Sequence, residues 1–208
     1  MMTERMEVVL GTRNYGKIAE FRALLKGLSI RMFSFFDFPD LPKVKEDGKT
    51  FKENAEKKAK AIAKATNKIA IAEDSGLVVD FLGGEPGVRS ARFSGDNASD
   101  KENTRRVLKL LYGVPWEQRT ARFVCVICAA DPNGQTVCSE GVCKGGVGFE
   151  MRGTHGFGYD PIFIPNGYKI TMAEMDQTQK NKISHRANAM KKFRDSLKHF
   201  LDVRRKRM

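Results

Sequence analysis

The sequence predicts a mixed α/β fold, and three observations support this. In the first half of the chain, apolar residues at helical spacing alternate with short apolar runs typical of strands. Two longer strand-like runs follow, joined by a turn. The chain then closes with a long amphipathic segment. Strands that alternate with helices, followed by a hairpin, are typical of a mixed β-sheet with flanking helices.

The elements of the first half are marked by their apolar runs and by their boundary residues. Thr50 and Glu53 have the spacing of a capping box, which marks a helix start. The strand that follows is expected to end at Glu73, where turn-forming residues begin. The predicted elements are a strand at 6–10, a helix from about Gly16, an extended piece at 30–36, a helix from Thr50 to Ala65 and a strand at 68–72.

The second half has equally clear boundaries. Ser99 and Glu102 form a second capping-box pattern, which predicts a helix to Leu111. Strands at 120–130 and 136–142 are expected to form a hairpin. A glycine-rich aromatic loop occupies residues 145–161, and Ser184 is a candidate N-cap for the last helix.

Length and charge narrow the class of protein. A chain of 208 residues predicts a single domain, residues 1–208. The sequence has no apolar run long enough to span a membrane, and its first residues do not resemble a secretory signal. We therefore expect a cytoplasmic protein. The formal charge is +12, and eleven Lys and Arg lie between Lys180 and Met208. The basic tail at about 202–208 is either a solvated chain end or a surface for polyanions.

The four cysteines are Cys125, Cys128, Cys138 and Cys143. A zinc site is one reading, but Cys125 and Cys128 lie three apart on a predicted strand and so point to opposite faces. Buried, reduced cysteines are therefore expected, as is usual in the cytosol.

The stretch "LGTRNYGKIAEF" at residues 10–21 turns a strand into a helix through two glycines and two cations. Helix N-termini bind anions, and glycine lets the backbone approach them closely. Gly11 and Gly16 have P-loop spacing, but Ile18 replaces the magnesium-binding hydroxyl, which disfavours a P-loop NTPase. The corner is either a phosphate site or an ordinary turn.

Two carboxylates, Glu73 and Asp74, follow a predicted strand, where open α/β sheets bind their ligands. Oxygen ligands in such a place suit Mg²⁺, and Glu46 could add another. The alternative is a plain turn.

Two further stretches carry potential ligand contacts. Residues 156–161, Gly-Phe-Gly-Tyr-Asp-Pro, could lay an aromatic ring against a flat base, or could be a surface turn. Residues 184–186, Ser-His-Arg, together with Lys180, gather donors and cations at a helix start, or simply cap a basic helix.

Taken together, these stretches resemble the inosine/xanthosine triphosphate pyrophosphatase family from about residue 6 to about residue 200. The motifs that carry the resemblance are Thr12–Lys17 with Glu20, Thr50–Ala55, Glu73–Leu77, Pro86–Gly95, Gly156–Phe163 and Ser184–Arg186. The resemblance implies an elongated mixed β-sheet with flanking helices and two lobes around a central substrate cleft. It also implies a homodimer that hydrolyses ITP, dITP and XTP to the monophosphate and pyrophosphate with Mg²⁺.

The resemblance also implies roles for single residues. Asp74 would be the catalytic base and, with Glu46, a metal ligand, while Ser75 would touch the substrate. His185 and Arg186 would face the 6-oxo edge of the purine. The remaining implied substrate contacts are Thr12, Arg13, Asn14, Tyr15, Gly16, Lys17, Phe157, Gly158, Tyr159, Asp160 and Lys180.

Two other functions compete with this interpretation. A basic module could bind nucleic acid through its tail, although the acidic groups at the expected site make nucleic acid an unlikely partner. A related pyrophosphatase could prefer pyrimidine or modified nucleotides, and only its choice of base would distinguish it.

Overall fold

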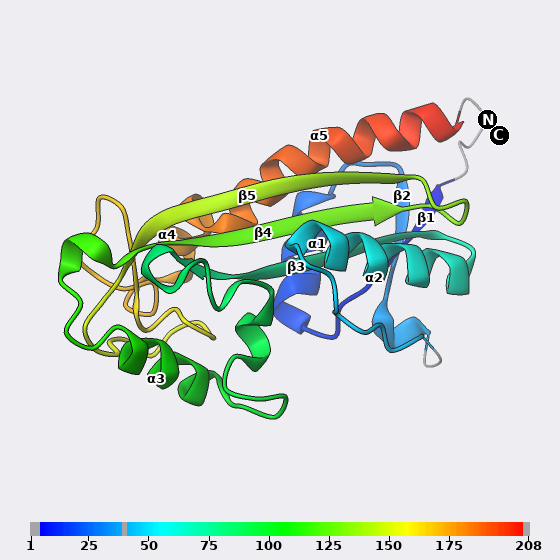
Figure 1. Cartoon of the computed structure of the whole chain (residues 1–208). Coiled ribbons are helices and arrows are strands. Elements are labelled where there is room, and N and C mark those ends of the chain that lie inside the picture. The colour runs from blue at the N-terminus through cyan, green and yellow to red at the C-terminus, as the bar shows by residue number, and fades with distance from the viewer. Residues whose placement is uncertain (1–4, 39–40, 206–208) are drawn as a thin grey trace. The chain divides into compact units, whose positions relative to one another are not determined.

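The computed structural model describes residues 5–38 and 41–205 (Figure 1). Its helices are α1 (Tyr15–Leu24), α2 (Phe51–Thr66), α3 (Asp100–Leu110), α4 (Gln177–Ile183) and α5 (His185–Arg205). Its strands are β1 (Met6–Leu10), β2 (Ile30–Ser34), β3 (Ile69–Val79), β4 (Thr120–Ala130), β5 (Thr136–Val147) and β6 (Phe163–Pro165). None of the helices in these ranges is long and apolar enough to cross a membrane.

Within the described ranges, six strands form one mixed sheet in the order β2-β1-β3-β4-β5-β6. β1 runs parallel to both β2 and β3, whereas β5 and β6 are antiparallel. The mixed α/β prediction, a sheet with flanking helices, is confirmed. The backbone groups of neighbouring strands in the sheet are paired by hydrogen bonds, which orders the residues that these strands carry.

The chain divides into two compact units. Unit 1 contains residues up to Asp74, then 126–140, then the chain from Ala189; unit 2 contains 75–125 and 141–188. Three strands, β3, β4 and β5, therefore contribute residues to both units. The basic tail predicted at about 202–208 belongs to α5 as far as Arg205, and residues 206–208 lie outside the described ones.

Helix starts follow the capping signals. Ser99 and Glu102 form a complete capping box at α3, and Ser184 Oγ accepts a hydrogen bond from the Ala187 N–H at the start of α5. At α2, Thr50 Oγ1 accepts from the Glu53 N–H at 3.1 Å. The Glu53 carboxylate accepts instead from the Lys49 N–H at 2.7 Å, so the predicted reciprocal capping box is only half formed.

Several expectations about secondary structure were wrong. The strand predicted at 136–142 continues to Val147, into the segment expected to be a loop. The strand expected to end at Glu73 continues to Val79, because the apolar residues 77–79 are buried and extend the sheet past the turn-forming Asp-Ser-Gly. Helix α4 was not predicted, since its seven residues bury no side chain and give no apolar periodicity. Its only local signal is the capping box between Asp176 and Gln179.

Helix α5 packs on the unit 1 part of β5 (Figure 1). Ser196 and Ser139 hydroxyls lie 3.3 Å apart, and Lys192 Nζ donates to the Glu140 carbonyl at 3.0 Å. Phe193 and Leu197 of α5 are fully buried. The helix therefore completes the unit 1 core as well as covering strand surface.

Unit 2 has its own apolar core, which contains residues of β3, α3, β4 and β5. At its edge the Arg119 guanidinium is buried and donates to four backbone carbonyls, those of Leu111, Val114, Val147 and Gly148, at 2.6 to 3.4 Å. Burial lowers the pKa of Arg119 from its usual value. A planar guanidinium has five donors, which suits it to join chain segments in this way.

The hairpin of β4 and β5 corrects the cysteine prediction. Asp131 N–H donates to the Gln135 carbonyl at 3.0 Å and closes the turn. Cys128 and Cys138 lie three residues to either side of that pair, so the register sets them opposite each other, and they form a disulfide. Reduced, buried cysteines are found only at Cys125 and Cys143 among the described residues. The prediction considered only the spacing of cysteines within one strand, whereas the partner of Cys128 lies on the neighbouring strand, β5.

Candidate active site

The corner after β1 is shaped by close packing and by a helix cap. A side chain at Gly11 would lie 3.2 Å from the Ile71 carbonyl oxygen and would displace the end of the Ile62 side chain, so the backbone packs closely there. Asn14 Oδ1 accepts from the Lys17 N–H at 3.1 Å and caps α1. The predicted strand-to-helix corner thus has a helix N-terminus at its exit, the feature that binds anions.

β3 continues past the carboxyl end of β1, and this places two carboxylates beside the corner. The parallel register pairs Leu10 with Ile71, and Gly11 N–H donates to the Ile71 carbonyl at 2.7 Å. Glu73 and Asp74 come next on β3, beyond the last residue of β1. Lys17 Nζ lies 2.6 Å from Glu73 Oε1, and the Glu73 side chain is only 5% exposed. Glu73 therefore orients the lysine of the corner.

Asp74 is held from α2 by two side chains. Asn54 Nδ2 donates to Asp74 Oδ2 at 3.0 Å, and Lys58 Nζ lies 3.4 Å from Asp74 Oδ1. Asn54 is fully buried, and its Oδ1 accepts from the Gly48 N–H at 2.8 Å, which fixes the orientation of its amide. Residues 54 and 58 are one helical turn apart, so α2 presents both to the same carboxylate.

The electrostatics of Asp74 are set by opposing effects. Burial raises the pKa of the Asp74 carboxyl above its usual value, and the charge of Glu46 raises it further. Lys58 and the hydrogen bond from Asn54 act against this by favouring the charged form. A carboxylate with a raised pKa is a better proton acceptor, because basicity follows pKa.

The predicted metal ligands come together around one ammonium group. Lys58 Nζ lies 2.7 Å from Glu46 Oε1 and 3.4 Å from Asp74 Oδ1, so it links the two carboxylates. Two carboxylates gathered around a positive charge, from a loop and a strand, fit a hard divalent cation by the chemistry of their oxygen donors.

The other predicted residues of the corner have different surroundings. The Arg13 guanidinium lies 4.2 Å from the centre of the Phe35 ring, and Tyr15 stacks on Phe36 at 4.9 Å. Tyr15 is 74% exposed. Thr12 Oγ1 accepts from the Asn14 N–H at 3.2 Å, and a side chain at position 16 would lie 3.2 Å from Asn14 Oδ1. Ser75 follows Asp74 on β3 and is partly buried.

Unit 2 holds the second group of predicted residues. Phe157 is 52% exposed at a turn, where Asp160 Oδ2 accepts from the Phe157 N–H at 3.0 Å. Gly158 N–H donates to Asp100 Oδ2 at 2.7 Å, which ties the turn to α3. Tyr159 is buried and donates from its hydroxyl to the Ser90 carbonyl at 2.8 Å. Tyr159 therefore supports the turn from inside, and Phe157 presents its ring outward.

Cations lie beside that exposed ring. Lys180 Nζ forms an ion pair with Asp160 and lies 5.3 Å from the centre of the Phe157 ring. The Arg186 guanidinium lies 5.6 Å from the same centre. Gly156 has a φ of 83°, a backbone conformation that favours glycine. Cations at this range are attracted to an aromatic face.

His185 and Arg186 are both buried at the start of α5. The His185 ring stacks on Phe123 at 4.8 Å with an interplanar angle of 17°. A strand of the sheet thus fixes the imidazole plane.

The structure divides the predicted residues between two clusters. The unit 1 cluster contains Asn14, Lys17, Glu46 and Asp74, and the unit 2 cluster contains Phe157, Gly158, Tyr159, Asp160, Lys180, His185 and Arg186. Sequence reasoning gave Asn54 and Lys58 no role, although Asn54 lies in the Thr50–Ala55 motif, and it considered Glu73 only as an oxygen ligand beside Asp74. The available signal was Asn54, a polar residue next to Ala55 on the alanine-rich face of α2, with Lys58 four residues later.

The sequence matches a known protein family and named relatives over most of its length. The model of the Ham1 family matches residues 8–196. A protein of Desulforamulus reducens named dITP/XTP pyrophosphatase is 50% identical over 92% of this chain and 96% of its own length. A protein of Geobacter sulfurreducens with the same name is 49% identical over 91% and 96%.

Solved structures agree with these relatives. A HAM1 protein from Coxiella burnetii matches with a TM-score of 0.87 and 40% identity, over 93% of this chain and 99% of that one. The Ham1 protein of Staphylococcus aureus matches with a TM-score of 0.84 and 39% identity, over 95% and 99%. The resemblance drawn from the short motifs is confirmed.

Proposed function

The chain belongs to the Ham1 family, and on that premise we propose that it hydrolyses deaminated purine nucleoside triphosphates. The substrates are ITP, dITP and XTP, and the products are the nucleoside monophosphate and pyrophosphate. The reaction is an acid-anhydride hydrolysis that removes these nucleotides from the pool available to polymerases.

The observation that carries the proposal is the environment of Asp74. A partly buried carboxylate, held by Asn54 and flanked by Lys58 and Glu46, stands next to a helix-capped corner that presents Lys17. Water attack on the α-phosphorus needs a group that positions the water and accepts its proton. Asp74 has the raised pKa and the fixed orientation for that role.

The remaining groups of the unit 1 cluster match a triphosphate. Asp74 and Glu46 would hold Mg²⁺, which, when bound, supplies charge that offsets the charge developing on pyrophosphate. Lys17 and Lys58 add positive charge from the protein itself. The N-terminus of α1, with Thr12 through Lys17, cradles phosphate oxygens. Ser75 adds a hydroxyl next to the catalytic carboxylate.

The unit 2 cluster matches the purine base. Phe157 offers an exposed ring for stacking, and Gly158 to Asp160 hold it in place. Lys180, His185 and Arg186 supply donors toward a 6-oxo group. Adenine has an amine at that position, and a buried donor facing an amine goes unpaired, which costs about 1–3 kcal/mol.

Partners and location complete the proposal. The nucleotide is the partner that the cluster chemistry selects, and nucleic acid has no role in it. A homodimer is proposed from the family resemblance. Cytoplasmic location follows from the proposed substrate, since the nucleotide pool is there.

Product analysis tests the proposal. The purified chain is incubated with Mg²⁺ and, separately, with ITP, XTP, dITP, ATP, GTP and CTP, with a chelator-treated sample as control. We expect pyrophosphate with IMP, XMP or dIMP, slow turnover of ATP and GTP, and none with chelator. Orthophosphate with a diphosphate would mean attack at the γ-phosphorus and would refute the mechanism. Equal rates on ATP and ITP would refute the proposed base choice.

A further inference from the structure

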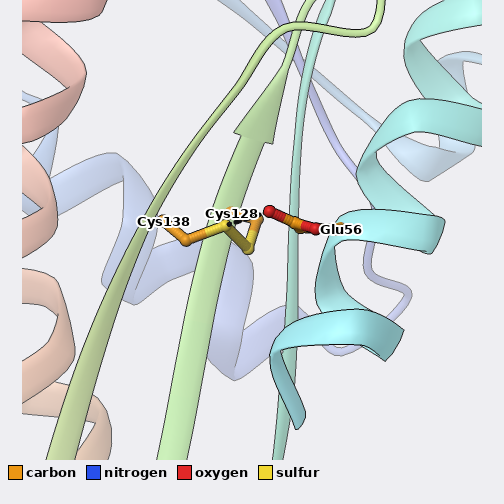
Figure 2. A group of neighbouring side chains, drawn as sticks. All are labelled: Glu56, Cys128 and Cys138. Carbon is orange, nitrogen blue, oxygen red and sulfur yellow. Dashed lines mark hydrogen bonds between the residues drawn. A yellow bond between two sulfur atoms is a disulfide. The ribbon is translucent and has the colours of Figure 1, made fainter. Parts of the chain in front are cut away.

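A second group of metal-ligand side chains lies in unit 1, where α2 faces the β4–β5 hairpin (Figure 2). It contains Glu56 of α2, Cys128 of β4 and Cys138 of β5. The potential ligand atoms of these residues all lie within 4.8 Å of one another. Figure 2 shows the Glu56 carboxylate pointing at the two sulfur atoms, which are joined as a disulfide.

The Glu56 carboxylate is oriented by neighbours. Its Oε1 accepts from Thr136 Oγ1 at 3.2 Å and lies 3.6 Å from Cys138 Sγ. A hydrogen bond from Thr136 fixes the carboxylate in the way that outer partners fix metal ligands. A reduced Cys138 could donate to Glu56, whereas a disulfide sulfur has no proton to donate.

A cavity of about 250 Å³ lies beside these groups. Cys138, Glu56, Thr136 and Ser139 contribute to its lining. The space is large enough for an ion and for a water molecule that completes its coordination. Glu56 and Cys138 therefore face the cavity, whereas Cys128 is fully buried behind Cys138, to which it is bonded.

We propose that the dithiol form of Cys128 and Cys138, together with Glu56, binds one Zn²⁺-like cation. Two thiolates and one carboxylate leave the fourth tetrahedral position for water, which is the open form of zinc site. Thiolate ligands favour zinc over magnesium, so this site is chemically distinct from the oxygen donors Asp74 and Glu46. The disulfide seen in the structure is its metal-free form.

The two forms interconvert by a balanced exchange. A low-molecular-weight disulfide accepts two electrons from the two thiolates, so its own sulfur–sulfur bond breaks while the bond between Cys128 and Cys138 forms. Its two released thiolates take two protons from solvent and become thiols, and the cation is released. In a reducing cytosol the dithiol form is favoured.

The site is separable from the Asp74 cluster. Two residues along a helix correspond to a rotation of about 200°. Glu56 therefore projects from the opposite side of α2 to both Asn54 and Lys58, which contact Asp74. A change at Glu56 is expected to leave the contacts of Asp74 in place.

Cobalt titration tests the proposal on the full chain. The protein is reduced, freed of reductant without oxygen and titrated with Co²⁺, whose thiolate charge-transfer absorption reports sulfur ligands only. We expect one equivalent bound, displacement by Zn²⁺, and loss of the band in Cys128→Ala and Cys138→Ala. Glu56→Gln should weaken binding at least tenfold. Cys125→Ala, a matched change of a buried cysteine on β4 that lies outside the disulfide, should bind normally.

The unmutated protein supplies a control that does not depend on any variant folding. Oxidised wild type should give no band, and a small disulfide added to the loaded protein should release the metal with two thiols per chain. No band in the reduced wild type would overturn the proposal. So would a band that persists in Cys138→Ala or after oxidation, or one that is lost in Cys125→Ala. Unchanged affinity in Glu56→Gln would also overturn the three-ligand site.

Discussion

The unit 1 and unit 2 clusters are built in opposite ways. In unit 1, buried and partly buried carboxylates meet lysines and an asparagine, and each charge has a partner within 3.4 Å. In unit 2, an exposed phenylalanine ring stands on a glycine turn with cations at its side. Charge chemistry needs fixed groups in a dry setting, whereas base recognition needs an accessible flat surface. The contrast predicts that turnover and base choice respond to different residues.

The largest expected effect comes from Asp74→Asn in the unit 1 cluster. Asparagine keeps the shape but cannot accept a proton, so kcat should fall at least about 100-fold, the usual range for a lost general base. Steady-state kinetics on ITP would measure this. Asp195→Asn, at an exposed position on α5, is the control and should be unaffected. Retained turnover in Asp74→Asn with an intact fold would remove this residue from its role.

Lys17→Met comes next. Loss of its charge should lower kcat/KM by about 10- to 100-fold, as expected for one charged contact of about 1.5–3 kcal/mol. The substitution also removes the ion pair between Lys17 and the buried Glu73, so a loss of kcat/KM in the single variant could come from either effect. The double variant Lys17→Met/Glu73→Gln removes that complication. If the double variant recovers full kcat/KM, Lys17 only neutralises Glu73 and does not bind phosphate.

In unit 2, Arg186→Ala should act on selectivity. We expect the preference for ITP over ATP to narrow about tenfold, because one donor toward the 6-oxo group is worth roughly 1.4 kcal/mol. Competition assays with the two nucleotides would measure it. Lys182→Ala, at an exposed position on α4, controls for loss of charge. An unaltered preference would place base choice elsewhere.

The smallest effect concerns the stability of unit 2 rather than catalysis. Burial raises the pKa of the Cys143 thiol from 9.0 to about 11. The unfolded chain releases this proton first, so the free energy of unfolding should fall as pH rises from 9.0 to about 11, by about 2 kcal/mol. Cys143→Ala should remove that part of the loss, while Cys125→Ala should not. Denaturant titrations below pH 9.0 and above about pH 11 measure the free energy of unfolding. The prediction would be contradicted if this free energy changed equally with pH in wild type and in Cys143→Ala.

Sequence alone predicted the features that are set locally. Helices at Ser99 and Ser184 begin where their caps indicate, because a cap needs only the first turn. The end of β3 was mispredicted because Asp-Ser-Gly favours a turn locally, while burial of residues 77–79 in the sheet outweighs it. Tertiary packing overrides local preference at such places.

Candidate site residues could be proposed where short motifs marked them. Asn14, Lys17 and Asp74 could be chosen from residues next to a helix start or strand. Asn54 and Lys58 could not be assigned a role, because their contacts with Asp74 form only when α2 packs against β3. The Cys128–Cys138 disulfide likewise needed the hairpin register, which turn chemistry fixes only once the turn is placed.

The division into units has a consequence for synthesis. Unit 1 includes Asp74 but also the last segment, which begins at Ala189 and whose Phe193 and Leu197 are fully buried. Chains emerge from the ribosome N-terminus first, and domains fold as units. The proposed catalytic carboxylate is thus made early, but we expect its supporting core to close only when α5 has emerged. Nascent chains would therefore acquire activity only after α5 has emerged, and loss of α5 would abolish the chemistry proposed for Asp74.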